Sequence, residues 1–165
     1  MSLEKIIKYC KKSESLLEES KEIYRLKGKI NSLGNEEFKA TWIPSRNIRE
    51  IYNFFKHLEI NRFTHFCELG AGDARVSLIA HLEFDLKATA FEFCYKTYSI
   101  TKRRIRKCFP EAEINLVYAN YEEYDLSQFD VFYLYPWFIE DVYFIVDKIK
   151  NGKKEKLLII YDLLK

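Results

Sequence analysis

From residue 64 onward, short apolar runs alternate with longer stretches of helical periodicity, and this alternation restricts the fold of the 165-residue chain more than any other feature. The apolar runs predict strands, and the stretches between them predict helices near 73–82, 95–107 and 138–150. The predicted strands are Thr64–Glu68, Lys87–Glu92, Ile114–Tyr118, Phe129–Tyr135 and Leu157–Tyr161. Runs that are apolar on both faces are typical of parallel strands covered by helices on each side. We therefore expect an α/β fold with a doubly wound, mostly parallel sheet and helices on both faces.

Two further helices are expected before the first strand. The first is amphipathic and extends to about Lys27, because its apolar residues recur every three or four positions: Leu3, Ile6, Ile7 and Cys10. A linker containing Gly28 and Gly34 follows. The second helix is expected after Ser45, which can cap it. We expect one domain over residues 1–165, with an N-terminal helical extension (1–58) and an α/β core (62–165).

Composition excludes several classes of protein. The chain is 48% hydrophobic and 32% charged, which is typical of a compact soluble domain. Its net charge of +2 is too small to argue for nucleic-acid or membrane binding by itself. No apolar run approaches the roughly 20 residues that span a bilayer, so we expect no membrane association. The four cysteines form no Cys-x-x-Cys pair, and no signal peptide precedes them, so we expect reduced thiols in the cytoplasm.

A glycine turn at the end of the first predicted strand is the most informative motif. Gly70 and Gly72 allow a sharp turn and let a ligand lie against bare main chain. A dinucleotide site would have a third glycine where this chain has Arg75. Glu68 would repel a pyrophosphate but can attract an amino group. The turn therefore favours a cationic ligand without phosphates, although two glycines alone also fit an ordinary strand-to-helix turn.

The segment Glu68-Leu69-Gly70-Ala71-Gly72 resembles the first motif of class I S-adenosylmethionine (SAM) dependent methyltransferases, and the resemblance extends over roughly residues 40–162. It implies a Rossmann-like fold, SAM as cofactor and S-adenosylhomocysteine as product. In that family a second acidic residue, here Glu92, binds the ribose hydroxyls, and Asn120 and Tyr121 occupy the adenine positions. The implied cofactor-binding residues are Glu68, Gly70, Ala71, Gly72, Asp73, Glu92, Phe93, Asn120 and Tyr121. From the residues alone, Asp73 is equally explained as a helix cap, and Arg75 as a surface ion-pair residue.

The methyl acceptor is less well defined. Gly72-Asp73-Ala74-Arg75 and Trp42-Ile43-Pro44-Ser45 are similar to segments of the small protein-lysine methyltransferases, which implies a lysine side chain on a protein as acceptor. The fourth strand ends in Tyr135-Pro136-Trp137, where amine-methylating relatives have Asn or Asp followed by Pro-Pro-Tyr. Tyr135 and Trp137 are the candidate catalytic residues, because aromatic walls can align a nucleophile and hold an ammonium group. Packing of these aromatics in the core is the alternative.

Three functions stay open at this level: an active methyltransferase, a SAM-binding protein without catalysis, and an RNA methyltransferase or RNA-binding partner. The family's sheet has seven strands, and this chain is expected to be truncated after strand five. Two basic clusters could contact RNA phosphates: Lys102-Arg103-Arg104-Arg106-Lys107, and Lys153-Lys154 with Lys156. Such runs are usually solvated surfaces of helices. His57, His65 and His81 lack metal-ligand spacing, so we expect no metal. The protein is expected to be a monomer or homodimer.

Overall fold

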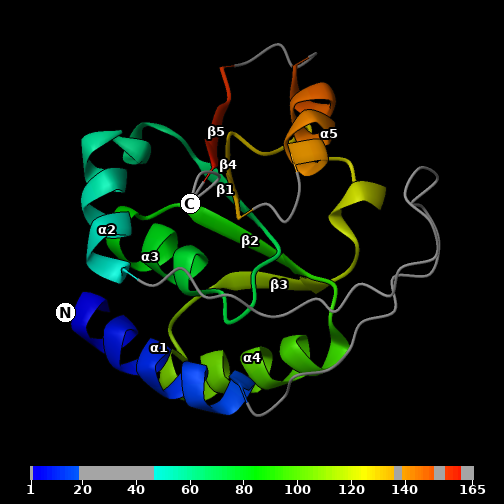
Figure 1. Cartoon of the computed structure of the whole chain (residues 1–165). Coiled ribbons are helices and arrows are strands. Elements are labelled where there is room, and N and C mark those ends of the chain that lie inside the picture. The colour runs from blue at the N-terminus through cyan, green and yellow to red at the C-terminus, as the bar shows by residue number, and fades with distance from the viewer. Residues whose placement is uncertain (1, 19–46, 136–138, 151–154, 161–165) are drawn as a thin grey trace.

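The computed structural model describes residues 2–18, 47–135, 139–150 and 155–160, and these form an α/β fold built on one parallel sheet (Figure 1). The strands are β1 (His65–Leu69), β2 (Lys87–Glu92), β3 (Ile114–Tyr118), β4 (Val131–Leu134) and β5 (Leu157–Ile160), in the order β3-β2-β1-β4-β5. All four strand pairs are parallel. The helices are α1 (Ser2–Glu18), α2 (Ile48–His57), α3 (Arg75–Phe84), α4 (Tyr95–Cys108) and α5 (Ile139–Ile149), with the short 3-10 turns η1 (Ile60–Arg62) and η2 (Tyr121–Glu123).

The predicted fold class is confirmed, and each predicted strand agrees with an observed one to within two residues. The three helices predicted after the first strand are also present as α3, α4 and α5. One boundary differs in the N-terminal part. The cap of α2 is Asn47, whose side chain accepts a hydrogen bond from the Glu50 amide, and not Ser45. Ser45 and the predicted linker lie outside the described residues, as does the expected extension of α1 beyond Glu18.

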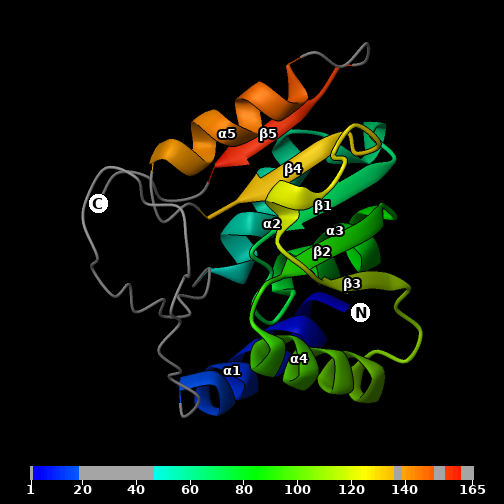
Figure 2. The same cartoon turned by 90° about the vertical axis from the view of Figure 1, so that its right-hand side faces the viewer.

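The sheet separates two hydrophobic clusters because its side chains alternate between the two faces. Phe66, Ala88, Ala90, Val131 and Tyr133 pack with α1, α2, α3 and part of α4 on one face. The residues next to them in sequence pack with α5 and the segment after β3 on the other face: Cys67, Leu69, Phe91, Phe132 and Leu134. This is why the central strands are mostly apolar, whereas the edge strand β3 leaves Asn115 and Tyr118 exposed. Figure 2 shows the layers, with α4 below β3 and α5 beside β5.

The two N-terminal helices are packed onto the same face as α3. Ile6 and Cys10 of α1 and Ile51 and Phe55 of α2 are buried in the cluster that contains the strands. The Phe55 ring lies 5.7 Å from that of Phe66 in β1. Because α1 and α2 flank α3, α3 is covered by helices as well as by the sheet, and Val76 to Ala80 are all buried. A helix that is apolar all round is the expected result of such an environment.

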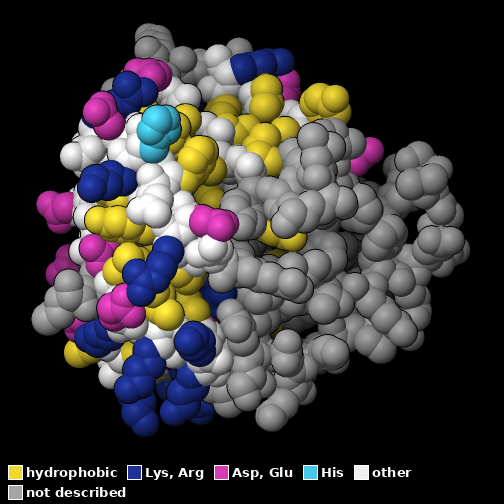
Figure 3. Space-filling view, turned by 60° about the vertical axis from the view of Figure 1, so that its left-hand side comes forward, with side chains coloured by type: hydrophobic (Ala, Val, Ile, Leu, Met, Phe, Trp, Pro, Cys, Tyr) yellow, Lys and Arg dark blue, Asp and Glu magenta, His cyan; other side chains and the backbone are white. Residues whose placement is uncertain are grey.

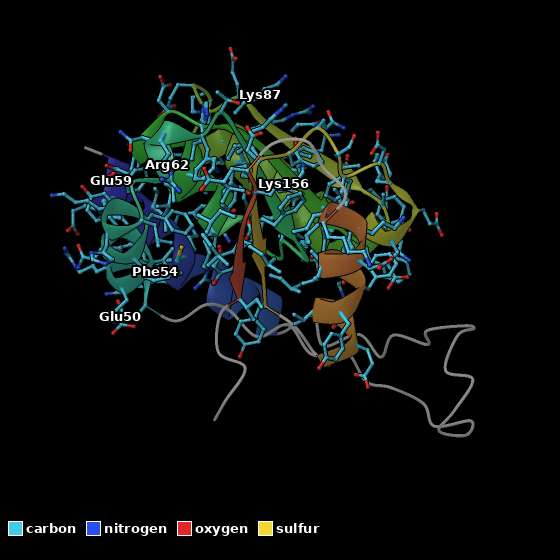
Figure 4. The ribbon with its side chains drawn as sticks, turned by 90° about the horizontal axis from the view of Figure 1, so that it is seen from above. Glu50, Phe54, Glu59, Arg62, Lys87 and Lys156 are labelled. Carbon is cyan, nitrogen blue, oxygen red and sulfur yellow. The ribbon has the colours of Figure 1, made fainter. Side chains whose placement is uncertain are left out.

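The two ends of the sheet differ in character. Figure 4 shows the side where strands begin, with Lys87 at the start of β2, Lys156 just before β5 and Arg62 in the turn before β1. Lys156 donates to the backbone carbonyl oxygens of Ser127 and Phe129, at 2.8 and 2.6 Å, which ties the start of β5 to the segment before β4. The opposite end carries the glycine turn. In the described residues no helix is long and apolar enough to cross a membrane.

Candidate cofactor site at the carboxyl edge of the sheet

The turn after β1 has the backbone geometry that its glycines predict. Gly70 and Gly72 have φ angles of +78° and +56°, in the region that favours glycine. The amides of Gly70 and Ala71 both donate to the carbonyl oxygen of Phe91 in β2, at 3.1 and 2.7 Å. A Cβ atom added to Gly70 would meet no atom within 4 Å, so the glycine is required by φ and not by crowding. The space beside Gly70 is therefore open to a ligand.

Ala74 ends the turn in a conformation that is unusual for alanine. Its φ of 57° lies in the left-handed region, and it directly precedes α3. Left-handed backbone costs a residue with a Cβ atom roughly 1–2 kcal/mol. A glycine at this position would avoid that cost.

Glu92 lies at the tip of β2 with its carboxylate held by backbone amides. Its Oε2 accepts from the Gly72 amide at 2.8 Å, and its Oε1 accepts from the Cys94 amide at 2.7 Å. Burial raises the pKa of Glu92, and the hydrogen bonds from backbone amides oppose that shift. Each carboxylate oxygen has a second lone pair. The side chain is thus fixed next to the glycine turn, is partly exposed and has capacity to accept from two hydroxyls.

Glu68 is directed into the protein. The residue is 3% exposed, and its Oε2 accepts from both the amide and the hydroxyl of Ser77, at 2.8 and 2.6 Å. It thereby satisfies an amide in the first turn of α3 that has no partner within the helix. Burial raises the pKa of Glu68 to about 8, although the bonds from Ser77 act in the opposite direction. This structural role was not anticipated from the sequence, and contact of Glu68 with a ligand stays a prediction.

The buried Glu68 predicts an unusual pH dependence of stability. The folded protein keeps a proton on Glu68 up to about pH 8, whereas the unfolded chain releases it near the ordinary value of 4.5. Between these values the folded state binds more protons, so its free energy of unfolding falls as pH rises, by up to about 1.4 kcal/mol per pH unit. The contribution is complete below pH 4.5 and is lost as pH rises through 8.

Glu68→Gln removes this titration while it keeps an oxygen for Ser77. We expect urea unfolding of the variant to show a flatter stability curve between pH 5 and 8 than the wild type, and greater stability at pH 8. Glu113→Gln, at an exposed site on the other end of the sheet, is the control and should keep the wild-type slope. Parallel curves for wild type and Glu68→Gln would show that Glu68 is already ionised at neutral pH.

Asp73 and Arg75 form a buried ion pair inside the turn. Arg75 Nε donates to Asp73 Oδ1 and Arg75 Nη2 donates to Asp73 Oδ2, both at 2.8 Å. The two side chains are each 2% exposed. The expectation that Arg75 is a surface residue is therefore wrong, although its role in an ion pair is correct. Asp73 also accepts from the Arg75 amide at 3.3 Å, so its polar atoms are largely engaged within the protein. The N-cap position of α3 is occupied by Ala74 and not by Asp73.

Two residues outside the predicted set hold the turn from neighbouring helices. The Tyr9 hydroxyl of α1 donates to the Asp73 carbonyl oxygen, and the Thr101 hydroxyl of α4 donates to that of Gly72, both at 2.8 Å. Burial raises the pKa of Tyr9. Tyr9 lies beside the apolar stripe of α1 and Thr101 on the buried side of α4, so helical periodicity marks both as inward-facing. Their polar partners are not visible in the sequence.

The other predicted cofactor residues lie along the same edge. Phe93 follows Glu92 and is 51% exposed. The Asn120 side chain caps η2 by accepting from the Glu122 amide at 3.1 Å. Tyr121 is half-buried against the α5 face of the sheet, and burial raises its pKa. Because Glu92 pairs in register with Tyr118, the segment from Ala119 to Tyr121 emerges next to the tip of β2.

The proposed acceptor residues are only partly described. Tyr135 directly follows β4 and is half-buried, whereas Trp137 lies outside the described residues. β4 adjoins β1, and the strand order reverses between these two strands. Tyr135 is thus placed where α/β folds bind ligands. Tyr133, two residues earlier, is core, with its ring 6.4 Å from that of Phe55. The catalytic roles of Tyr135 and Trp137 stay predictions.

His65, His81 and the four cysteines are hydrogen-bonded, packed against another ring or present as free thiols. His81 Nδ1 lies 3.0 Å from the Leu86 carbonyl oxygen and its Nε2 accepts from the Glu113 amide, which assigns the proton to Nδ1. His65 is half-buried, with its ring 5.4 Å from that of Phe129. All four cysteines are free thiols. No group of three His, Cys, Asp or Glu side chains is arranged to hold a metal ion in this part of the chain.

The basic cluster of α4 is divided between the two sides of the helix. Arg104 is buried and donates to the Tyr9 carbonyl oxygen at 2.8 Å and to the Ser13 hydroxyl, so it fastens α1 to α4. Lys102, Arg103, Arg106 and Lys107 face outward. In the second cluster Lys156 is bound to backbone oxygens, and Lys153 and Lys154 lie outside the described residues. Figure 3 shows Lys and Arg side chains gathered at the lower edge of the molecule, and α1 and α4 occupy the lower part of the molecule in Figure 1.

Comparison with known proteins identifies the fold. No protein-family profile matches the sequence, and no curated protein matches it. Among solved structures, the chain is similar to a candidate caffeoyl-CoA O-methyltransferase from Staphylococcus aureus (TM-score 0.59, 14% identity, 72% of this chain and 59% of that one). It is also similar to an RNA methyltransferase from Salinibacter ruber in complex with S-adenosyl-L-homocysteine (TM-score 0.54, 14% identity, 65% and 71%). A third is the methyltransferase PaMTH1 from Podospora anserina, bound to S-adenosylhomocysteine (TM-score 0.55, 12% identity, 72% and 53%).

These similarities show the Rossmann-like fold of class I SAM-dependent methyltransferases, as the motif resemblance implied. The chain spans just over half the length of two of the three structures and 71% of the third. The β3-β2-β1-β4-β5 sheet agrees with that fold up to its fifth strand.

Proposed function

We propose that the protein is a SAM-dependent methyltransferase. The observation that carries the proposal is the pairing of an open glycine turn with the fixed Glu92 carboxylate at the carboxyl edge of a parallel sheet. This combination is suited to a nucleoside without phosphates, because a carboxylate accepts from ribose hydroxyls and repels a pyrophosphate. The similarity to methyltransferase structures supports the same ligand, since two of those structures contain S-adenosylhomocysteine.

The residues present fit SAM on their chemistry. Glu92 would accept from the two ribose hydroxyls with the lone pairs that Gly72 and Cys94 leave unused. Phe93 and Tyr121 would offer aromatic surfaces to the adenine, and Asn120 a hydrogen bond. The bare main chain at Gly70 would admit the amino-acid portion. SAM itself supplies a methyl group already activated on a sulfonium, so the protein mainly has to align the acceptor and exclude water.

The acceptor is the least supported part of the proposal. A protein lysine is the acceptor implied by the sequence resemblance, but the names of the similar structures concern caffeoyl-CoA and RNA. Tyr135 is proposed to line the acceptor side, because it leaves β4 where the strand order reverses. RNA is the second candidate acceptor and is favoured by the unpaired cations on α4. A SAM-binding protein without catalysis is the competing function.

Two measurements test the proposal in sequence. Isothermal titration calorimetry with S-adenosylhomocysteine is expected to show one site per chain, and NAD⁺ under the same conditions is expected to show none. Transfer of labelled methyl groups from SAM to total RNA and to total protein then separates the acceptors. Binding without transfer to either pool would favour the non-catalytic function, and absence of binding would reject the proposal.

A further inference from the structure

The outward side of α4 carries a stripe of aromatic and basic residues. Positions 95, 98, 99, 102, 103 and 106 recur at the spacing of one helical face. The opposite side of the helix is buried through Thr97, Thr101, Arg104 and Ile105. The stripe lines an open pocket of about 570 Å³ formed by Tyr95, Tyr98, Ser99, Lys102, Arg103, Arg106 and Lys107. None of these residues was assigned to the cofactor site above.

Three tyrosines form an exposed aromatic platform at one end of this stripe. The ring of Tyr118, at the end of β3, lies 5.4 Å from that of Tyr95 and 5.6 Å from that of Tyr98. Tyr95 is 65% exposed and Tyr118 is 52% exposed. Large aromatic rings gathered in solvent contribute little to the core. Such rings are the surfaces on which unpaired bases stack in proteins that bind single-stranded nucleic acid.

The cations of the stripe lack acidic partners in the described residues. Lys102 Nζ donates to the Tyr98 hydroxyl at 2.6 Å and lies 5.0 Å from the centre of that ring. Arg103, Arg106 and Lys107 make no hydrogen bond or ion pair with any described residue. Some cations elsewhere on the surface are paired, as in Lys5–Glu111 and Arg62–Glu155. The outward side of α4 thus carries four cations that have no acidic partner among the described residues, in a chain whose net charge is only +2.

The stripe begins beside the candidate cofactor site. Tyr118 is the register partner of Glu92, and Tyr95 follows Glu92 by three residues. From there α4 runs for 14 residues, about 20 Å, toward the other end of the sheet, below β3 in Figure 2. A strand of several nucleotides can therefore contact the platform and the cations together.

We propose that the outward side of α4, with Tyr118, binds a single-stranded nucleic acid, whose bases stack on the tyrosines and whose phosphates contact Lys102, Arg103, Arg106 and Lys107. Charge alone would equally suit an acidic peptide or an anionic membrane. The tyrosine platform next to the cations favours nucleic acid, because every base offers a π-face beside its phosphate. The proposal concerns a docking surface and does not require methyl transfer, so its failure would leave the SAM proposal intact.

Binding is tested with the full chain and a fluorescein-labelled 12-nucleotide single-stranded RNA of mixed sequence, by anisotropy in 50 mM salt. A DNA oligonucleotide of the same sequence shows whether the ribose matters, and binding of either supports the proposal. With three or four phosphate contacts, the logarithm of affinity should fall with that of salt at a slope of about −2 to −3. Arg103→Glu/Arg106→Glu should weaken binding at least 10-fold and reduce this slope.

The control carries the same change of charge elsewhere: Lys56→Glu/Lys150→Glu alters exposed positions on α2 and after α5, and should change affinity less than about 2-fold. Tyr95→Ala and Tyr118→Ala should each weaken binding by about 5-fold or more, as expected for loss of one stacked base. Unchanged affinity for S-adenosylhomocysteine and an unchanged melting temperature establish that each variant is folded. Equal loss in the control, no effect of the tyrosine variants, or equally tight binding of polyglutamate or of phosphatidylserine vesicles would overturn the proposal.

Discussion

Replacing Glu92 by alanine is expected to weaken the binding of S-adenosylhomocysteine by about 1.5–3 kcal/mol, which corresponds to roughly 10- to 150-fold in Kd. The carboxylate would lose its bonds to the ribose hydroxyls, and a hydrogen bond to a charged group contributes about this much. The substitution would also remove the hydrogen bonds that the Glu92 carboxylate accepts from the amides of Gly72 and Cys94, at 2.8 and 2.7 Å. The loss therefore combines a missing ligand contact with a less ordered turn.

Calorimetric titration of Glu92→Ala, Glu92→Gln and a control variant, each compared with the wild type, separates these two contributions. Glu92→Gln keeps one side-chain oxygen for an amide and should bind with affinity between those of the wild type and Glu92→Ala. Glu113→Ala, an exposed residue at the far end of the sheet, controls for the loss of a carboxylate and should bind as the wild type does. Urea unfolding reports how much stability each variant loses. An unchanged Kd for Glu92→Ala would reject the ribose assignment.

The fold was predictable because its pattern is local. Strands β2 and β3 are short, mostly apolar runs that lie between stretches of helical periodicity, so the bounds 87–92 and 114–118 follow from the residues alone. The glycine turn was also predictable from the sequence. Gly70 and Gly72 have positive φ angles, which glycine adopts readily. The N-terminal boundary of α2 was harder to predict, because Ser45 and Asn47 both satisfy the preference for a capping side chain.

The side-chain partners at the site were not predictable from local pattern. Glu68 accepts a hydrogen bond from Ser77, nine residues away in sequence. Tyr9 of α1 donates one to Asp73, 64 residues away. Arg75 was expected on the surface because arginine usually is. The overlooked indication was that residues 76–80 contain no charged position. A helix without a polar face is buried, and a charge at its first residue must then be paired internally.

Replacing Arg75 by alanine is therefore expected to destabilise the protein by about 3–5 kcal/mol. The change would leave the Asp73 carboxylate buried without the two bonds at 2.8 Å that now neutralise it. Because a domain of this kind is stable by only about 5–15 kcal/mol, the variant would lie near the limit of folding. Urea unfolding at pH 7 measures the change, and ligand affinity should fall with it because the pair lies within the turn.

Two further variants distinguish an unpaired charge from simple loss of packing. Asp73→Asn/Arg75→Met removes both charges and keeps most of the volume, so it should be more stable than Arg75→Met alone, which leaves Asp73 charged. Arg62→Ala breaks an ion pair whose members are 54% and 72% exposed, and should cost less than about 1 kcal/mol. If Arg75→Ala and Arg62→Ala proved equally mild, water would have to reach Asp73, and the turn would not be held in a fixed shape for ligand binding by this ion pair.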